Sequence, residues 1–360
     1  MANGRYSISF PTPKLLFMGT AAALLCTLTL NAGNWADRIG LSGFATAKYQ
    51  QLDEDNFFNG GNGEGVGKDG SWYNTKLGIN ITAPVDEKVS VAAQLFATHE
   101  DDFNMVLDWG FISYSLTDEV SLRAGKIKFP VGIVNEYIDV GNTYPWINPP
   151  ELFYTELAAG PNVTREAYTG ASALWETDAG ETEIGIDLFG GEIGLESMNL
   201  KKLLGMKIRL DWNDIVAFQA TYYRGTMRDT AMAAMEGKIH SNIALGLNFD
   251  WNDLIGYAEW AKTDMELEAM NGTSWYATLG YQMDEWLPHL TFQHFSKGKD
   301  SATPQEQEMV TAGVRYDLSD NSDLKVEYSR IKTKKGKGLF ANTPADDTAG
   351  RFGIAVDVVF

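Results

Sequence analysis

Ionic side chains recur at every second position within apolar stretches of this sequence. In "LLGMKIRLDW", Lys207, Arg209 and Asp211 alternate with Met206 and Leu210. Successive side chains of an extended strand lie on opposite faces, so such a stretch has one ionic face and one apolar face. Rings of Lys and Arg lower the barrier that a carboxylate or phosphate meets in a pore. The chemistry that these residues could perform is therefore the electrostatic guidance of ions.

Bases slightly outnumber acids on the predicted ionic faces, although the chain has 48 acidic and 29 basic residues and a net charge of −19. The bases are Lys48, Lys76, Arg123, Lys207, Arg209, Arg315, Lys325 and Arg351. The acids are Asp187, Asp211, Glu259, Asp317, Glu327 and Asp357. Lys126 and Lys128, in "GKIKFP", modestly favour anions. Three hypotheses stay open: the bases pair with acids and line a weakly selective channel, they select anions, or the channel prefers cations.

Other chemistry has weaker support in the sequence. The acidity argues against nucleic-acid binding, which needs basic surface. The four histidines have no metal-ligand spacing, and no "GxSxG" serine motif occurs, so we expect no catalytic residue, no resident metal and no cofactor. The alternative is a divalent cation at acidic external loops, for which the first glycine-rich loop offers Asp53, Glu54, Asp55, Glu64 and Asp69.

Sixteen stretches with this alternation predict the elements that position the ionic residues. They are 38–51, 71–83, 88–99, 104–116, 120–129, 167–176, 182–190, 202–212, 215–225, 240–251, 254–263, 274–282, 289–296, 308–318, 323–332 and 350–360. Most have a length near the 9–11 residues with which a tilted strand crosses a bilayer. An even number of antiparallel strands can close into a barrel.

The connections between these stretches alternate between short and long. The short ones include "PVDE", "TDAGE" and two copies of "ND", whereas the long ones include 52–70, 130–166, 191–201 and 333–349. Short turns on one side and long loops on the other are typical of outer-membrane barrels. Ionic groups of this density would be costly against lipid or in a dry core. We therefore predict a transmembrane β-barrel around a water-filled lumen, whose width at about sixteen strands admits a channel.

The first residues have the pattern of an export signal. Arg5 and Lys14 precede the apolar "LLFMGTAAALLCTLTL", and "NAG" follows. We expect cleavage after Ala32, which makes 1–32 a signal peptide and 33–360 the barrel domain. A lipoprotein signal at Cys26 is the alternative, although the preceding "ALL" lacks a small residue before the cysteine.

The strand number, the alternation of loops and the terminal "RFGIAVDVVF" resemble the Gram-negative outer-membrane porins over essentially the whole mature chain. The resemblance implies that the last strand closes the barrel and carries the signal read by the barrel-insertion machinery. The matching positions are Phe352, Ile354, Val356, Val358 and Phe360. It also implies a homotrimer in the outer membrane, in contact with lipid and lipopolysaccharide, through which small hydrophilic solutes diffuse.

The resemblance further implies that the third external loop folds inward and narrows the channel. Here this loop is 130–166, and its Glu136, Asp139, Glu151 and Glu156 could face basic residues of the wall. The acidic "PEFGG"-like element of the general porins is absent, and "TYPWINPP" looks more like porins near the phosphate-selective and dicarboxylate-type channels. The alternatives to a passive channel are an outer-membrane hydrolase and a structural barrel that surrounds a partner protein.

Overall fold

The computed structural model describes residues 38–58, 65–155, 167–194 and 199–360. The predicted signal peptide, Glu64 and Glu156 lie outside these residues. Among the described residues, no helix is long and apolar enough to cross a membrane.

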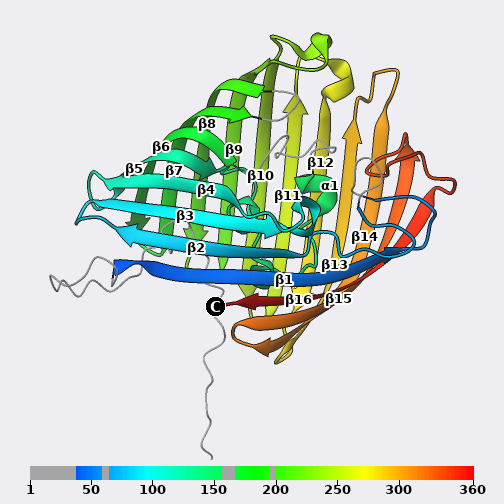
Figure 1. Cartoon of the computed structure of the whole chain (residues 1–360), viewed down its shortest axis with the longest axis horizontal. Helices are drawn as coiled ribbons and strands as arrows, with labels where there is room; N and C mark the ends of the chain where they lie inside the picture. The colour runs from blue at the N-terminus through cyan, green and yellow to red at the C-terminus, as the bar shows by residue number, and fades with distance from the viewer. Residues whose placement is uncertain (1–37, 59–64, 156–166, 195–198) are drawn as a thin grey trace, which may run out of the picture.

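Sixteen antiparallel strands form one closed barrel in which each strand pairs with its neighbours in the chain. Figure 1 shows them following one another around the barrel until β16 reaches β1. The strands are β1 (Gly40–Leu52), β2 (Lys76–Pro84), β3 (Val89–Thr98), β4 (Val106–Ser115), β5 (Val120–Lys128), β6 (Ala167–Ala179), β7 (Thr182–Gly194), β8 (Asn199–Trp212), β9 (Val216–Arg228), β10 (Ile239–Trp251), β11 (Leu254–Asp264), β12 (Gly272–Tyr281), β13 (Trp286–Lys297), β14 (Gln305–Ser319), β15 (Ser322–Lys335) and β16 (Thr348–Val359). The predicted fold class is confirmed.

The last strand closes the barrel against the first. The β1–β16 register runs from Phe44 opposite Val359 to Leu52 opposite Arg351. Beyond it, the Gly43 amide donates to the Phe360 carbonyl (2.7 Å), and the Phe360 amide donates to the Gly43 carbonyl (2.9 Å). The terminal apolar strand is therefore fully paired, and it does not form the open edge that favours aggregation.

Alternation along β16 separates an outer apolar face from an inner polar face. The outward residues Phe352, Ile354, Val356, Val358 and Phe360 are between 37% and 64% exposed. Arg351, Ala355 and Asp357 are each 2% exposed and lie on the inner side. An apolar band that meets lipid and a polar interior are typical of barrels that span a membrane.

The repeated "DWND" segments form tight turns at one end of the barrel. Asn213 and Asp214, followed by Ile215, connect β8 to β9 with φ of 55° and 56°, and Asn252 and Asp253 alone connect β10 to β11 with φ of 48° and 68°. Two consecutive residues with positive φ suit a two-residue hairpin, and Asn and Asp tolerate that conformation. The preceding Trp212 and Trp251 are exposed, as expected for an interfacial aromatic girdle.

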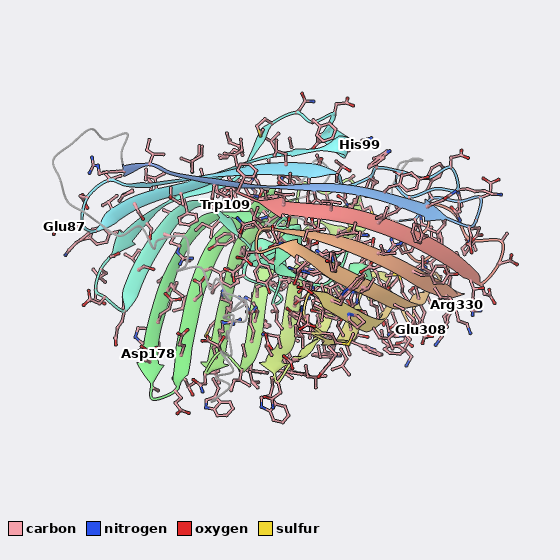
Figure 2. All side chains as sticks on the ribbon, turned by 90° about the horizontal axis from the view of Figure 1, so that it is seen from below. Glu87, His99, Trp109, Asp178, Glu308 and Arg330 are labelled. Atoms are coloured by element: carbon pink, nitrogen blue, oxygen red, sulfur yellow. The ribbon has the colours of Figure 1, made fainter. Side chains whose placement is uncertain are left out.

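Strand lengths differ from the sequence prediction mainly at the other end. The predicted long connection 191–201 is only 195–198, because β7 extends to Gly194 and β8 begins at Asn199. β2 begins at Lys76, five residues later than predicted. Figure 2 shows Glu87 and Asp178 at the end with the short turns, and Glu308 and Arg330 towards the end with the long loops.

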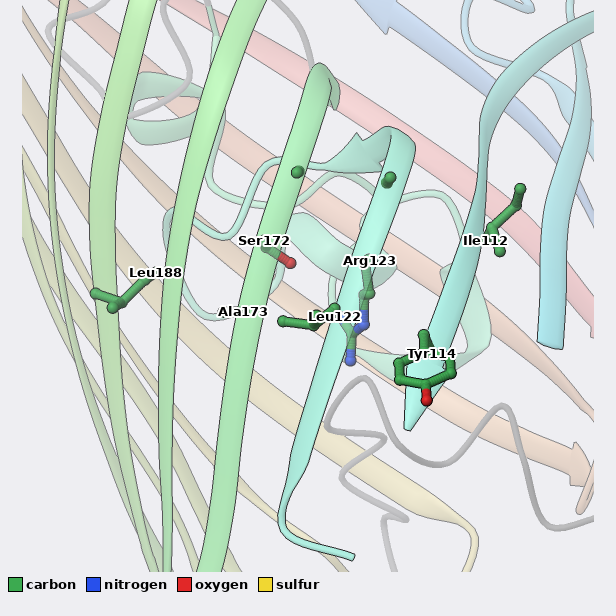
Figure 3. Close-up of a pocket in the computed structure, with 9 residues that line it drawn as sticks. Ile112, Tyr114, Leu122, Arg123, Ser172, Ala173 and Leu188 are labelled. Carbon is green, nitrogen blue, oxygen red and sulfur yellow. The ribbon is translucent and has the colours of Figure 1, made fainter. Parts of the chain in front are cut away.

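A depression on the outer wall lies between β4 and β7 (Figure 3). Small side chains leave room there between larger apolar ones: its lining includes Ala124, Ala171 and Ala173 together with Ile112, Tyr114, Leu122 and Leu188. This part of the wall presents an apolar surface, as lipid or another apolar surface requires.

Candidate functional site

The inner wall carries the ionic residues at the positions that alternation predicts. On β8, Lys207 and Asp211 are each 5% exposed, whereas Met206, Leu210 and Trp212 are 39–48% exposed on the other face. Lys207 lies directly opposite Asp187 of β7, and Arg209 opposite Gly185. The paired strands thus bring basic and acidic side chains together on the lumen side.

The third long loop folds into the barrel. Its large aromatic residues Tyr144, Trp146 and Phe153 are at most 2% exposed. The Trp146 Nε1 donates to the Thr278 Oγ1 (3.1 Å) and to the Thr291 Oγ1 (2.9 Å) on the opposite wall. The inward fold of this loop agrees with the sequence prediction, and it makes the loop the narrowing element of the lumen.

Three loop carboxylates form ion pairs with three bases of the wall. Glu136 lies 2.6 Å from the Lys207 Nζ, and Asp139 lies 2.6 Å from the Lys128 Nζ. Residues 129–155 contain no Lys or Arg, so every cation in these pairs comes from the wall. Burial disfavours ionisation of Asp139, but the charges of Lys128 and Lys76 outweigh it and lower the pKa of this carboxyl below its usual range.

The third pair joins α1 (Glu151–Tyr154), within the loop, to β16. The Arg351 guanidinium donates to both Glu151 oxygens, at 2.9 Å and 2.5 Å, and both side chains are almost fully buried. A bidentate Arg–carboxylate pair has a fixed geometry, so it holds α1 in one position against the wall.

Other wall bases bind the backbone of the loop. The Lys76 Nζ donates to the Ile138 carbonyl (3.3 Å), the Lys325 Nζ donates to the Gly141 carbonyl (2.6 Å), and an Arg315 Nη donates to the Asn142 carbonyl (2.6 Å). Lys325 also lies 2.8 Å from Asp357, and Arg315 lies 2.6 Å from Asp317. The predicted lumen bases are thus largely neutralised by acids and carbonyl groups.

Gly141 allows this close contact between the loop and the wall. A Cβ at this position would lie 1.8 Å from an Asp357 oxygen, so no larger residue fits without moving the loop. The loop backbone therefore approaches β15 and β16 as closely as glycine permits.

Arg123 and Lys126 differ from the other predicted bases. Arg123 is 6% exposed, and its guanidinium lies 5.6 Å from the centre of the Phe111 ring. Lys126 pairs across strands with Gly110 and Thr169, on the outward face, and its Nζ donates to the Leu107 carbonyl (2.8 Å). A spacing of three residues puts Arg123 and Lys126 on opposite faces of β5, so the structure does not bring Lys126 to the lumen group.

Glu259 was predicted on the ionic inner face but not at the constriction, and the structure makes it a central residue of the site. Its carboxylate accepts hydrogen bonds from the Ile133 amide (2.8 Å), from the Tyr276 hydroxyl (2.6 Å) and from the Tyr154 hydroxyl. Burial, followed by the Glu259 charge, raises the pKa of Tyr154 well above its ordinary value. Glu259 thus joins both ends of the described part of the loop to β11. The sequence did hold one sign of this role. Glu259 and Tyr276 lie directly opposite each other on neighbouring strands, and both point inward.

Two of the acidic residues proposed for a divalent cation, Asp53 and Glu54, bind backbone amides. The Asp53 Oδ1 accepts from the Gly350 amide (2.7 Å), and the Glu54 Oε1 accepts from the Ala345 amide (2.9 Å). Within the described ranges, no group of three or more His, Cys, Asp or Glu residues is arranged to hold a metal ion.

Comparison with known structures agrees on the barrel. OmpT, an outer-membrane protein of Vibrio cholerae in its trimer form, matches with a TM-score of 0.61 and 12% identity over 89% of this chain and 99% of that chain. OmpF of Salmonella typhi, in complex with daunomycin, matches with a TM-score of 0.61 and 13% identity over 91% and 99%. The outer-membrane channel DcaP of Acinetobacter baumannii matches with a TM-score of 0.58 and 14% identity over 89% and 97%. These likenesses concern the fold.

The family of the chain follows from its sequence. No curated protein sequence matches it. The family model of the Gram-negative porins, in contrast, matches residues 19–336, which is most of the chain. The chain therefore belongs to the Gram-negative porin family, as a channel protein of the outer membrane.

Proposed function

We propose that this chain is a passive channel through which small hydrophilic solutes and ions diffuse, and that its charge selectivity is weak. The observation that carries the proposal is the ionic inner face of a closed sixteen-strand barrel, narrowed by a loop whose Glu136, Asp139 and Glu151 each pair with a base of the wall. Because paired charges largely cancel, they present only a small field to a passing ion.

A mild preference for anions is the second candidate. It is supported by Lys76 and Arg123, for which the described part of the chain shows no ion pair: Lys76 donates to a carbonyl group, and Arg123 lies over the Phe111 ring. Basic side chains in a pore lower the barrier for anions. A place near the phosphate-selective and dicarboxylate-type porins stays a prediction.

The reversal potential in a salt gradient decides between the two candidates. A weakly selective channel gives a reversal potential near zero. An anion-preferring channel gives a reversal potential clearly different from zero, with the sign expected for anion flow. Lys207→Gln removes a positive charge and leaves Glu136, so it should shift the reversal potential towards cations. The control is Lys201→Gln, which removes an exposed lysine paired with Glu192. No shift in Lys207→Gln would show that Lys207 lies away from the constriction.

Two other functions have less support. A barrel that surrounds a partner protein needs a free lumen, whereas here the third loop contacts β2, β8 and β16 from inside. A hydrolase needs a nucleophile activated by a base, and the sequence contains no "GxSxG" serine motif.

Several properties of the mature protein belong to the same proposal. The chain assembles as a homotrimer, as the trimer form of the OmpT relative supports, and native mass measurement tests this. Residues 1–32 are removed on export, which the N-terminal sequence of the mature protein would reveal. The outward residues of β16 and Phe360 serve the barrel-insertion machinery, and the outer wall contacts lipid and lipopolysaccharide.

A further inference from the structure

The loops after β1 and after β15 bury large apolar side chains at the mouth with the long loops. We name their described residues loop 1 (53–58 and 65–75) and loop 8 (336–347). Phe58 and Val66 of loop 1, and Leu339 and Phe340 of loop 8, are at most 1% exposed. Loops that extend freely into water cannot bury such residues, so these two loops must pack against something.

The two loops pack against each other. The Phe58 and Phe340 rings meet edge to face with centroids 5.1 Å apart, and the two residues pair as a short antiparallel bridge. The Ala341 amide donates to the Phe57 carbonyl (2.9 Å). Figure 1 shows the two loops side by side at one end of the barrel, beyond β1 and β16.

Loop 8 is also fixed to the inner wall. The Gln305 Oε1 accepts from the Lys337 amide (2.9 Å) and the Gly338 amide (3.0 Å), and the Gln307 Oε1 accepts from the Leu339 amide (3.1 Å). Gly338 has a φ of 58°, which favours glycine, and a Cβ there would lie 2.6 Å from the Gln307 side chain. The chain is thus built to turn inward at this point.

Loops 1 and 8 both pack against the third loop, which narrows the lumen. Their buried side chains form one apolar cluster with Leu152 of α1 and with residues of the wall, namely Leu52, Phe295, Met309, Ile331 and Ala349. The Arg351 guanidinium lies 5.1 Å from the centre of the Phe58 ring, a cation–π distance. Phe58 therefore covers the Arg351–Glu151 pair that positions α1.

We propose that loops 1 and 8 form a second, fixed constriction. It narrows the channel at the mouth with the long loops, on the side of the barrel formed by β13 to β16 together with β1. The proposal rests on the channel function proposed above. It makes Phe58 and Phe340 determinants of the solute size limit, because their rings fill space through which solute would otherwise pass. It also makes them positioning residues for α1, through the ion pair that they cover.

The test compares the full-length wild type with Phe58→Ala, Phe340→Ala and the double variant in planar bilayers and in liposomes. We expect a rise in single-channel conductance, and faster liposome swelling with trisaccharides than the wild type shows, with the largest gain in the double variant. Phe340→Leu retains an apolar side chain and should behave nearly as the wild type does. Met232→Ala, in the exposed loop after β9, is the matched control. An unchanged conductance and size limit in the folded double variant would overturn the proposal.

A second measurement applies even where the alanine variants fail to fold. Phe57→Cys with Ala341→Cys places two cysteines on the opposed strands of the loop bridge, and the only native cysteine, Cys26, lies in the predicted signal peptide. If the loops are already fixed together, oxidation leaves the conductance unchanged. A drop in conductance on oxidation, reversed by dithiothreitol, would show that the two loops normally separate. If the wild type itself does not conduct, the channel function fails; if only these variants give contrary results, only the second constriction fails.

Discussion

Arg351 lies where β16, α1 and loop 1 meet. It donates two hydrogen bonds to Glu151, and the Phe58 ring covers it. A charge in such a place depends on its partner, because burial removes the water that would otherwise solvate it.

Arg351→Gln should therefore lower the free energy of unfolding in detergent by about 3–5 kcal/mol, since it leaves the Glu151 charge buried and unpaired. Chemical denaturation followed by tryptophan fluorescence measures this loss. Lys201→Gln breaks the exposed pair with Glu192 and should cost no more than about 1 kcal/mol. Equal losses in the two variants would contradict the structural role of the buried pair.

Asp139 should make the third loop sensitive to acid. Its pKa is lowered in the folded protein, so its stabilising effect is fully present above the unfolded pKa of about 3.9 and is lost as the pH falls through the lower folded value. Asp139→Asn should thus destabilise the protein at pH 7 and much less near pH 3, in the same unfolding assay. Asp178→Asn, at an exposed position, is the control. A loss of the same size at both pH values would argue against the Lys128–Asp139 pair.

At the scale of single residues, the sequence predicts which side chains enter the lumen better than it predicts which of them pair. Glu136, Asp139 and Glu151 were expected to face bases of the wall, and they do, because an acidic loop inside a barrel meets whatever its inner face carries. Which base each would meet depends on the path of the loop backbone, which no strand periodicity encodes. Alternation puts Lys126 and Lys128 on the same face of β5 as Ala124, but Lys128 is the last residue of the strand and reaches Asp139 of the loop, which the strand pattern did not indicate.

At the scale of elements, the third loop is joined to the wall along its whole described length. Pro130 accepts from Thr221, Gly132 accepts from Gln219, and the Ile147 and Leu152 amides donate to Glu327 and Gln293. Strands on several sides of the barrel thus determine the position of the loop.

Gly141→Ala should displace the loop where it touches β15 and β16, because the added Cβ would overlap Asp357. We expect more frequent transitions between conductance levels in single-channel recordings, with the barrel still folded by circular dichroism. Gly185→Ala is the control, because a Cβ there has no contact closer than 4.0 Å. Recordings like those of the wild type would mean that the loop tolerates displacement.

All sixteen strands could be predicted from the sequence, because each must place an apolar face against lipid and a polar face inside. The largest differences lie at the mouth with the long loops, where β7 and β8 are longer and β2 begins later than predicted. At the end with the short turns, β6 ends and β13 begins three residues beyond the predicted bounds. The packing of loops 1 and 8 was not predicted, since it depends on contacts between residues almost 300 positions apart, such as Phe58 and Phe340.

At the scale of the whole molecule, the barrel combines an apolar exterior with an interior in which nearly every ionic group has a partner. The Gram-negative porin family and the closed barrel give the location and the class of channel.

The central claim is that water-filled passage occurs through this barrel, and single-channel recording tests it most directly. Purified, folded protein should add stepwise increments of conductance to a planar bilayer, and the increments should scale with the salt concentration. Folded protein that inserts into the bilayer and gives no such steps would contradict the account.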